Sequence, residues 1–325
     1  MRFKFIDLFA GIGGMRIAFE KVGGECVFSS EWDKFAQQTY LANFGESPHG
    51  DITQVELKDV PRHDILIGGF PCQPFSHAGL KRGFEDTRGT LFFDVARIID
   101  NRKPSMVLLE NVKGFTTHDK GRTMAVVKET LEDLGYNVFH RVLNARDFGV
   151  PQNRERVFIV AINKKKLGSI GFEYPIPKKT ETKLGDILES KVDDKYTISN
   201  KLWAGHKRRL REHRKKGNGF GYSLFNSNSP YTSTISARYY KDGSEILIEQ
   251  KEANPRKLTP REASRLQGFP ESFKIPVSDN QAYKQFGNSV AVPVIHAIAK
   301  NMVKLIENPE LRIPYIEWKQ LQLIS

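Results

Sequence analysis

The sequence predicts an α/β protein with a mixed, mostly parallel sheet and a second, smaller domain of irregular structure. Short apolar runs typical of strands alternate with helical patterns from the start of the chain to about residue 162. Such alternation predicts a mostly parallel sheet with helices on both faces. A basic, glycine-rich stretch then interrupts the alternation, and helical patterning returns near residue 258. In a sheet of this kind, ligands bind beyond the carboxyl ends of the strands.

Each expected element follows from its local pattern. Apolar runs predict strands at 4–9, 26–30, 65–68 and 107–110, and apolar spacing predicts helices at 15–22, 34–44, 91–102 and 123–134. The runs 138–144 and 156–162 predict a closing pair of strands, and 245–249 is strand-like. The last long helix is expected over 289–306, with Pro293 bending it or delaying its start.

Composition and charge narrow the class of protein. The 325 residues carry 50 Lys and Arg against 38 Asp and Glu, a net charge of +12 with a pI near 9.5. This balance favours a polyanionic partner, usually nucleic acid, although a basic protein without such a partner fits it too. Two cysteines exclude a disulfide framework and a Cys-rich zinc module, so no metal is expected. No run of 18 apolar residues predicts a membrane span, and Asp7 comes too early for a signal peptide, so we expect a cytoplasmic protein.

Two motifs at the ends of the first two strands suit a nucleoside ligand. The turn from Phe9 to Gly14 opens a helix, and its glycines let the backbone approach a ligand closely. Glu31 and Trp32 follow the second strand, where an acid can bind ribose hydroxyls and an indole can stack on adenine. The alternatives are an ordinary strand-to-helix turn and a core tryptophan beside a surface acid.

Later motifs supply groups for covalent chemistry. Cys72 lies on a loop after the third strand and is flanked by prolines, so its thiolate is a candidate nucleophile. Cys26, inside an apolar strand, is interpreted as a small buried side chain. Glu110 ends the fourth strand and is a candidate proton donor. Arg154 and Arg156 can bind an anion or a base oxygen, or lower a thiol pKa, although each also fits plain surface charge.

Taken together and in this order, the motifs resemble those of the C5-cytosine DNA methyltransferases. The motifs that carry the resemblance are the turn at Phe9–Gly14, Pro71-Cys72-Gln73, Glu110-Asn111-Val112, Gln152-x-Arg154-x-Arg156, Arg261-Glu262-x-x-Arg265-Leu266-Gln267-Gly268-Phe269-Pro270 and Gln285-Phe286-Gly287-Asn288-Ser289-Val290. The resemblance implies a Rossmann-like methyltransferase domain, dependent on S-adenosylmethionine, over residues 1–171. It implies a target recognition domain over 172–256 and a C-terminal segment, 257–325, that returns to the catalytic domain.

The resemblance also implies a reaction. The enzyme would flip a cytosine out of duplex DNA, attack C6 with Cys72 and transfer methyl from S-adenosylmethionine to C5. Glu110 matches the residue that protonates or hydrogen-bonds N3, Arg154 the residue that holds O2, and Arg156 a neighbour that orders the cysteine loop. No residue is assigned to removing the C5 proton, and water is possible.

The same resemblance assigns the cofactor contacts. Glu31 matches the acid on ribose, Trp32 the ring on adenine, and Asp51 with Ile52 the pair at the adenine edge. The residues expected to bind S-adenosylmethionine are Phe9, Gly11, Gly14, Glu31, Trp32, Asp51, Ile52, Pro71, Leu91, Asn288 and Val290.

The recognition segment is similar to that of bacterial enzymes that methylate the inner cytosine of CCWGG. Arg238 is expected to read guanine in the major groove, and the basic run 207–216 to contact phosphates, with a solvated helix face as the alternative. The expected DNA-binding residues are Arg208, Arg209, Thr234, Arg238, Tyr239 and Lys241. The expected partner is double-stranded DNA, bound by a monomer. A cognate restriction endonuclease would act on the same site in a restriction-modification system without necessarily binding the protein.

Other classes of protein remain as alternatives. Family members that act on tRNA carry a Cys-Phe-Thr signature in the variable region, whereas the two cysteines here are Cys26 and Cys72. A DNA-binding homologue without catalysis is disfavoured, because the catalytic positions hold the expected residues. A flavin or NAD oxidoreductase explains the glycine turn and leaves Cys72, Glu110 and Arg154 without a role.

Overall fold

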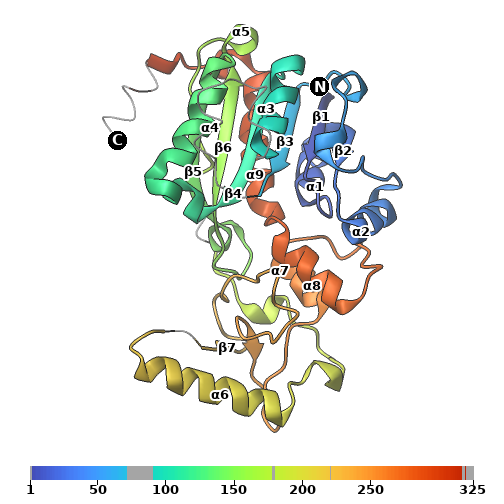
Figure 1. Ribbon diagram of the computed structural model, residues 1–325, viewed down its shortest axis with the longest axis vertical. Coiled ribbons are helices and arrows are strands. Elements are labelled where there is room, and N and C mark those ends of the chain that lie inside the picture. Colours follow the sequence, from blue (N-terminus) through green and yellow to red (C-terminus); the bar gives the residue numbers. More distant parts are fainter. Residues whose placement is uncertain (1, 72–90, 178–179, 220, 317–318, 320–325) are drawn as a thin grey trace.

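The main sheet of the protein is mixed and mostly parallel. The computed structural model describes residues 2–71, 91–177, 180–219, 221–316 and 319 (Figure 1). The sheet has the order β2-β1-β3-β4-β6-β5, in which β2, β1, β3 and β4 are parallel and β6 is antiparallel to both β4 and β5. Its strands are β1 Phe3–Leu8, β2 Gly24–Ser30, β3 Ile65–Gly69, β4 Met106–Val112, β5 Tyr136–Asn144 and β6 Glu155–Asn163. The predicted fold class is confirmed, including the closing pair of strands.

Helices cover both faces of this sheet and enclose two apolar cores. The helices of the chain are α1 Gly14–Glu20, α2 Lys34–Phe44, α3 Leu91–Arg102, α4 Arg122–Asp133, α5 Lys164–Leu167, α6 Asn200–Lys215, α7 Pro260–Leu266, α8 Asp279–Asn288 and α9 Val292–Glu307. Apolar residues of α3 and α4 pack on one face of the sheet, and those of α1 and α9 on the other. Helix α9 therefore lies behind the sheet in the view of Figure 1.

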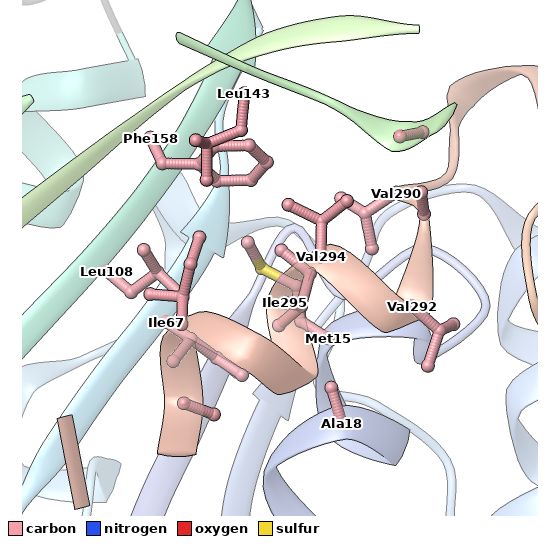
Figure 2. Packing of buried hydrophobic residues seen from close by; sticks show 14 of the residues in the cluster. Met15, Ala18, Ile67, Leu108, Leu143, Phe158, Val290, Val292, Val294 and Ile295 are labelled. Atoms are coloured by element: carbon pink, nitrogen blue, oxygen red, sulfur yellow. The ribbon is translucent and has the colours of Figure 1, made fainter. Parts of the chain in front are cut away.

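The C-terminal segment packs against the first turn of the chain. An added Cβ at Gly14 would lie 2.9 Å from Ser289 Oγ and 3.0 Å from Val290 Cγ2, so only a glycine leaves room for this return. Figure 2 shows Val292, Val294 and Ile295 beside Met15 of α1 on this face of the sheet. Gly14 therefore has a packing role, because it lets Ser289 and Val290 approach the first turn, in addition to lining the pocket.

The expected single helix over 289–306 is corrected in its first turn. Helix α8 ends at Asn288, Ala291 is extended, and α9 begins at Val292 with Pro293 in its first turn. Because proline lacks an N–H and is suited to a first helical turn, Pro293 delays the helix rather than bending it. The stretch Asp279–Glu307 has the length and apolar composition to cross a membrane, yet α9 buries its apolar side chains against α1 and the sheet.

The smaller domain has little regular structure apart from α6. Its two strands, β7 Leu224–Phe225 and β8 Leu247–Ile248, form a short parallel pair, so the strand expected over 245–249 is shorter than predicted. Tyr174 donates hydrogen bonds to the carbonyls of Phe139 and Phe158 on β5 and β6. The chain therefore still contacts the main sheet two residues beyond the division proposed at residue 172.

Candidate active site

A pocket of about 770 Å³ lies at the carboxyl ends of the parallel strands. Strand β1 has β2 on one side and β3 on the other, which makes this edge the point where the strand order reverses. Ligands bind at such points in open α/β sheets. The expected site residues that line the pocket are Phe9, Gly11, Gly14, Glu31, Trp32, Asp51, Ile52, Pro71, Leu91, Glu110, Arg154, Arg156, Asn288 and Val290. One cavity thus joins the residues expected to bind the cofactor to three of the four expected catalytic residues, Glu110, Arg154 and Arg156.

Glu31 organises the end of the pocket nearest β2. Its carboxylate accepts hydrogen bonds from the backbone N–H groups of Gly11 and Asp33, each at 2.8 Å. Burial raises the pKa of Glu31, and these two hydrogen bonds oppose that rise. Each carboxylate oxygen keeps a further lone pair for a hydroxyl donor. The sequence places Glu31 after β2 but gives no sign of these backbone contacts.

A short extension of the sheet brings Asp51 and Ile52 beside Glu31. His49 forms an isolated parallel bridge with Ser30, and its carbonyl accepts from the N–H of Glu31 at 2.8 Å. Asp51 then accepts from the N–H of Thr53 at 2.9 Å and caps a short 3₁₀ turn. The side chain of Trp32 stays 76% exposed, so its ring is available to a planar ligand at the mouth of the pocket.

Glu110 and Arg156 form an ion pair at the other end of the pocket. Glu110 Oε1 lies 3.1 Å from Arg156 Nε, and both side chains are mostly buried. Burial raises the pKa of Glu110, while the charges of Arg156 and Arg154 oppose that rise. A carboxyl group with a raised pKa is a better proton donor near neutral pH. The pairing of Gly69 with Glu110 in adjacent strands sets this group beside the loop that follows β3.

The same strand end holds the start of the cysteine loop. Asn111, which is buried, donates a hydrogen bond of 2.8 Å from Nδ2 to the carbonyl of Phe70. Pro71 lines the pocket, and Cys72, the predicted nucleophile, lies outside the described residues. The hydrogen bond from Asn111 therefore joins the residues after β3 to the end of β4.

Arg154 contacts backbone rather than the open part of the pocket. It is 2% exposed, and its terminal nitrogens donate to the carbonyls of Ile235, Gly287 and Ser289 at 3.1, 3.0 and 2.5 Å. Burial, together with the nearby charge of Arg156, lowers the pKa of Arg154 to about 9. These contacts direct the two terminal nitrogens to the backbone, whereas the buried Nε has no hydrogen-bond partner among the described residues, so the expected contact of Arg154 with a base oxygen stays a prediction. Arg154 links Ile235 of the smaller domain to Gly287 and Ser289, two residues of the C-terminal segment that line the pocket.

Comparison with known proteins decides the family. A family model for C-5 cytosine-specific DNA methylases matches residues 3–304. The chain belongs to the C-5 cytosine-specific DNA methylase family. The order of the motifs on this sheet is therefore that of a DNA cytosine methyltransferase.

Relatives of the methylase are similar over most of their length. The chain is 63% identical over 309 residues to the Type II methyltransferase M.SsoII of Shigella sonnei, which covers 94% of this chain and 82% of that protein. It is 64% identical over 310 residues to the Type II methyltransferase M1.ScrFI of Lactococcus lactis subsp. cremoris, covering 94% and 79%. Among solved structures, a mutant of Spodoptera frugiperda DNMT2 has a TM-score of 0.76 at 23% identity and covers 94% of this chain and 100% of that one. This structural likeness shows the fold.

The residues expected to bind DNA divide into two groups in the methylase. Arg208, Arg238 and Lys241 are exposed on the smaller domain, away from the pocket. Tyr239 is fully buried, and its hydroxyl donates to the carbonyl of Ile246 at 2.7 Å and accepts from the N–H of Leu258 at 2.8 Å. The prediction that Tyr239 contacts DNA is therefore wrong, because its ring and hydroxyl hold the turn together.

Thr234 and Arg209 both make contacts within the methylase that the sequence did not indicate. The hydroxyl of Thr234 donates to the carbonyl of Asn153 at 2.6 Å. This hydrogen bond connects the smaller domain to the residues just before β6, which include Arg154. Arg209 pairs with Asp242 at 3.0 Å. Arg209 nevertheless remains exposed, and Thr234 is half-buried.

Four charged residues that line the pocket of the methylase, Asp7, Asp33, Asp94 and Lys284, were not among the site residues predicted from the sequence. Asp7, at the end of β1, is 1% exposed, and its Oδ2 has no hydrogen-bond partner among the described residues. Burial raises the pKa of Asp7 to about 8. Asp94 lies in the first turn of α3, and Lys284 of α8 pairs with Asp33 at 2.8 Å. The sequence signal that could have pointed to Asp7 is the presence of an acid inside the apolar run of the first strand.

Proposed function

We propose that the pocket binds S-adenosylmethionine at its Glu31–Trp32 end and a flipped cytosine of duplex DNA at its Glu110–Arg156 end. The observation that carries this proposal is the single cavity lined by both sets of residues. Methyl transfer requires the donor and the base to meet with water excluded, and a shared cavity permits this.

The residues present fit this cofactor. Glu31 offers acceptor positions to ribose hydroxyls, and the exposed Trp32 offers a stacking surface to adenine. Asp7 Oδ2 is buried without a hydrogen-bond partner among the described residues, and a cationic methionine part bound beside it would favour the ionised form of this carboxyl against the rise in pKa that burial causes. When bound, the cofactor supplies a methyl group made electrophilic by its sulfonium.

The chain's own residues would activate the base. The thiolate of Cys72 attacks C6, which makes C5 nucleophilic, and the raised pKa of Glu110 favours donation of a proton to N3. A proton must later leave C5 so that Cys72 can leave from C6. Flipping the cytosine costs a few kcal/mol, which DNA contacts must offset.

Arg156 takes the role that the sequence suggested for Arg154. Both arginines line the pocket, but the guanidinium of Arg156 lies beside Glu110, whereas the terminal nitrogens of Arg154 donate to backbone carbonyls. The base edge that presents N3 also presents O2, so a donor beside Glu110 is well placed for O2. We therefore assign O2 to Arg156 and a positioning role to Arg154.

Glu31→Ala should weaken cofactor binding by about 1.5–3 kcal/mol, because ribose hydroxyls lose a charged acceptor. Quenching of tryptophan fluorescence during titration with S-adenosylhomocysteine measures the affinity, since Trp32 is expected to contact the adenine. Glu20→Ala, on the last turn of α1 outside the pocket, is the control. An unchanged affinity in Glu31→Ala would remove Glu31 from the cofactor site.

The rate of methylation should fall as pH rises through the pKa of Glu110. That pKa is raised, so the proton that N3 requires is present at low pH and is lost at higher pH. Glu110→Gln should lower the single-turnover rate by about 10²–10⁴ and abolish this alkaline limb. Rates measured from pH 5 to 10 test the assignment. A limb that persists unchanged in Glu110→Gln would assign it to another group.

We further propose that the smaller domain selects a short palindromic site of the CCWGG type within a restriction-modification system in the cytoplasm. The relatives at 63% and 64% identity are named Type II methyltransferases, which favours this setting over action on tRNA. The basic face of α6 would contact phosphates, and the protein would act on duplex DNA as a monomer. An endonuclease that cuts the same site would be its functional counterpart.

Arg238→Ala should relax discrimination at one base pair by about 1–3 kcal/mol, because the variant would lose a bidentate contact to guanine. The side chain of Arg238 is exposed on the smaller domain, where duplex DNA can reach it. Bisulfite sequencing of a plasmid methylated by each protein maps the sites. A wild-type site without a CC…GG frame would end the CCWGG assignment, and methylation of tRNA in preference to duplex DNA would contradict the proposed substrate.

A further inference from the structure

Asp242 joins the basic helix α6 to the turn that carries Arg238 and Lys241. Its Oδ2 lies 3.0 Å from Arg209 Nη1, and its carbonyl lies 3.2 Å from Nε2 of His206, a buried residue of the same helix. Its Oδ1 accepts from the N–H of Ser244 at 3.1 Å. The side chain and backbone of Asp242 therefore bind two successive turns of α6 at once.

Hydrogen bonds within the smaller domain hold the base of this turn. Ser236 Oγ donates to Glu245 Oε1 at 2.5 Å and accepts from the N–H of Arg238 at 3.1 Å. The buried Tyr239 connects the turn to Ile246 and to the chain before α7. At the tip of the turn, Asp242 makes two contacts with α6, one through its carboxylate with Arg209 and one through its carbonyl with His206. The position of Arg238 relative to α6 is thus set by a base inside the domain core and by Asp242.

Neighbouring arginines of α6 differ in what they contact. Arg208 is strongly exposed, with its side chain 73% accessible, and its nearest acid is Glu212 of the same helix at 3.7 Å. Arg209 is directed to Asp242, and this ion pair contributes to lowering the pKa of that carboxyl below its usual value. The charge of Arg209 is therefore partly neutralised by the turn, whereas that of Arg208 is available to a phosphate.

We propose that Asp242, held by Arg209 and His206, is a positioning residue for sequence discrimination. It fixes the turn to α6, so that phosphate contacts made along the helix set where Arg238 meets the base pair. The inference rests on the proposed function in that Arg238 reads a base. On this proposal, the Arg209–Asp242 pair affects which DNA sequence is methylated. A phosphate contact alone carries no sequence information.

The test compares Arg208→Ala with Arg209→Ala as matched removals of one charge. The measured quantity is the ratio of single-turnover methylation rates on the preferred duplex and on a duplex changed at the base pair identified with Arg238→Ala. Arg209→Ala and Asp242→Ala should each lower this ratio about tenfold, and the double variant should lower it no further, because both remove one contact. Arg209→Lys should recover most of the ratio, and Arg208→Ala should leave it unchanged.

Salt dependence gives a second readout on the same proteins. Arg208→Ala should flatten the log–log salt slope of DNA binding by up to about 0.9, the effect of one lost phosphate contact, and Arg209→Ala by less. If Arg208→Ala and Arg209→Ala lower the rate ratio equally, or Asp242→Ala leaves it unchanged while Arg238→Ala relaxes it, the positioning role is wrong and the base-reading proposal stands. If Arg238→Ala changes the ratio at no base pair, the recognition proposal fails, and this inference fails with it.

Discussion

Cys72→Ser should abolish methylation of duplex DNA, lowering turnover by a factor on the order of 10⁴–10⁶, as loss of a nucleophile does in other covalent enzymes. A serine hydroxyl is a far weaker nucleophile than a thiolate at neutral pH, so attack at C6 fails. Folding and cofactor binding should persist, because the cofactor end of the pocket is built from β1, β2 and the C-terminal return. Incorporation of labelled methyl into DNA measures the loss.

Cys26→Ser is the matched control for this change. Cys26 lies on β2 with its thiol 3.5 Å from the carbonyl of Phe28, and burial raises its pKa to about 12. A thiol of that kind is not nucleophilic at neutral pH. Cys26→Ser should therefore keep methylating DNA. Loss of activity in Cys26→Ser with activity retained in Cys72→Ser would contradict the assignment.

Arg156→Ala and Arg154→Ala should fail in different ways. Arg156→Ala should fold and lose about 10²–10³ in single-turnover rate, the cost of one preorganised donor at a site of developing charge. Its alkaline limb should move to higher pH, because Arg156 lowers the pKa of Glu110 and its removal lets that pKa rise. Rates measured across pH with the wild type as control separate this effect from a loss of folded protein.

Arg154→Ala should instead lower stability, by roughly 3 kcal/mol or more, because the buried carbonyls of Ile235, Gly287 and Ser289 lose their donor. Thermal unfolding should then shift down by about 5–10 °C. Arg154→Lys keeps the charge and cannot reach three carbonyls, so its melting temperature should lie between those of the wild type and Arg154→Ala. If Arg154→Ala had a normal melting temperature but a lost methylation rate, Arg154 would be assigned to O2 of the flipped cytosine after all.

The strands of the main sheet and the pocket residues Glu31 and Glu110 were predictable because they follow from local patterns in the sequence. Strands of this sheet are apolar runs, and Glu31 and Glu110 each follow or end such a run, so sequence position alone places them at one edge of the sheet. The return of Asn288 and Val290 to the first turn was predictable from the family resemblance. Its physical reason, the space left by Gly14, needed the structure.

The roles of Arg154 and Tyr239 were not predictable, because they depend on contacts between segments far apart in the chain. Nothing in the spacing of Arg154 and Arg156 tells which guanidinium meets backbone and which meets Glu110. Tyr239 lies between exposed residues in a basic segment, and its burial follows from the approach of Leu258 and Ile246. Asp7 is similar, since its lack of a partner is a property of the folded pocket.

Attack by Cys72 on a cytosine flipped into this pocket should leave a covalent bond between the protein and DNA. Mass spectrometry detects this bond after incubation of the protein with S-adenosylmethionine and a duplex carrying 5-fluorocytosine at the target, since fluorine at C5 cannot leave as a proton does and so blocks release of the cysteine. We expect a stable adduct whose mass includes the transferred methyl group and whose peptide map places the DNA on Cys72. An adduct on Cys26, or a Cys72→Ser protein that still forms the adduct, would contradict attack by Cys72.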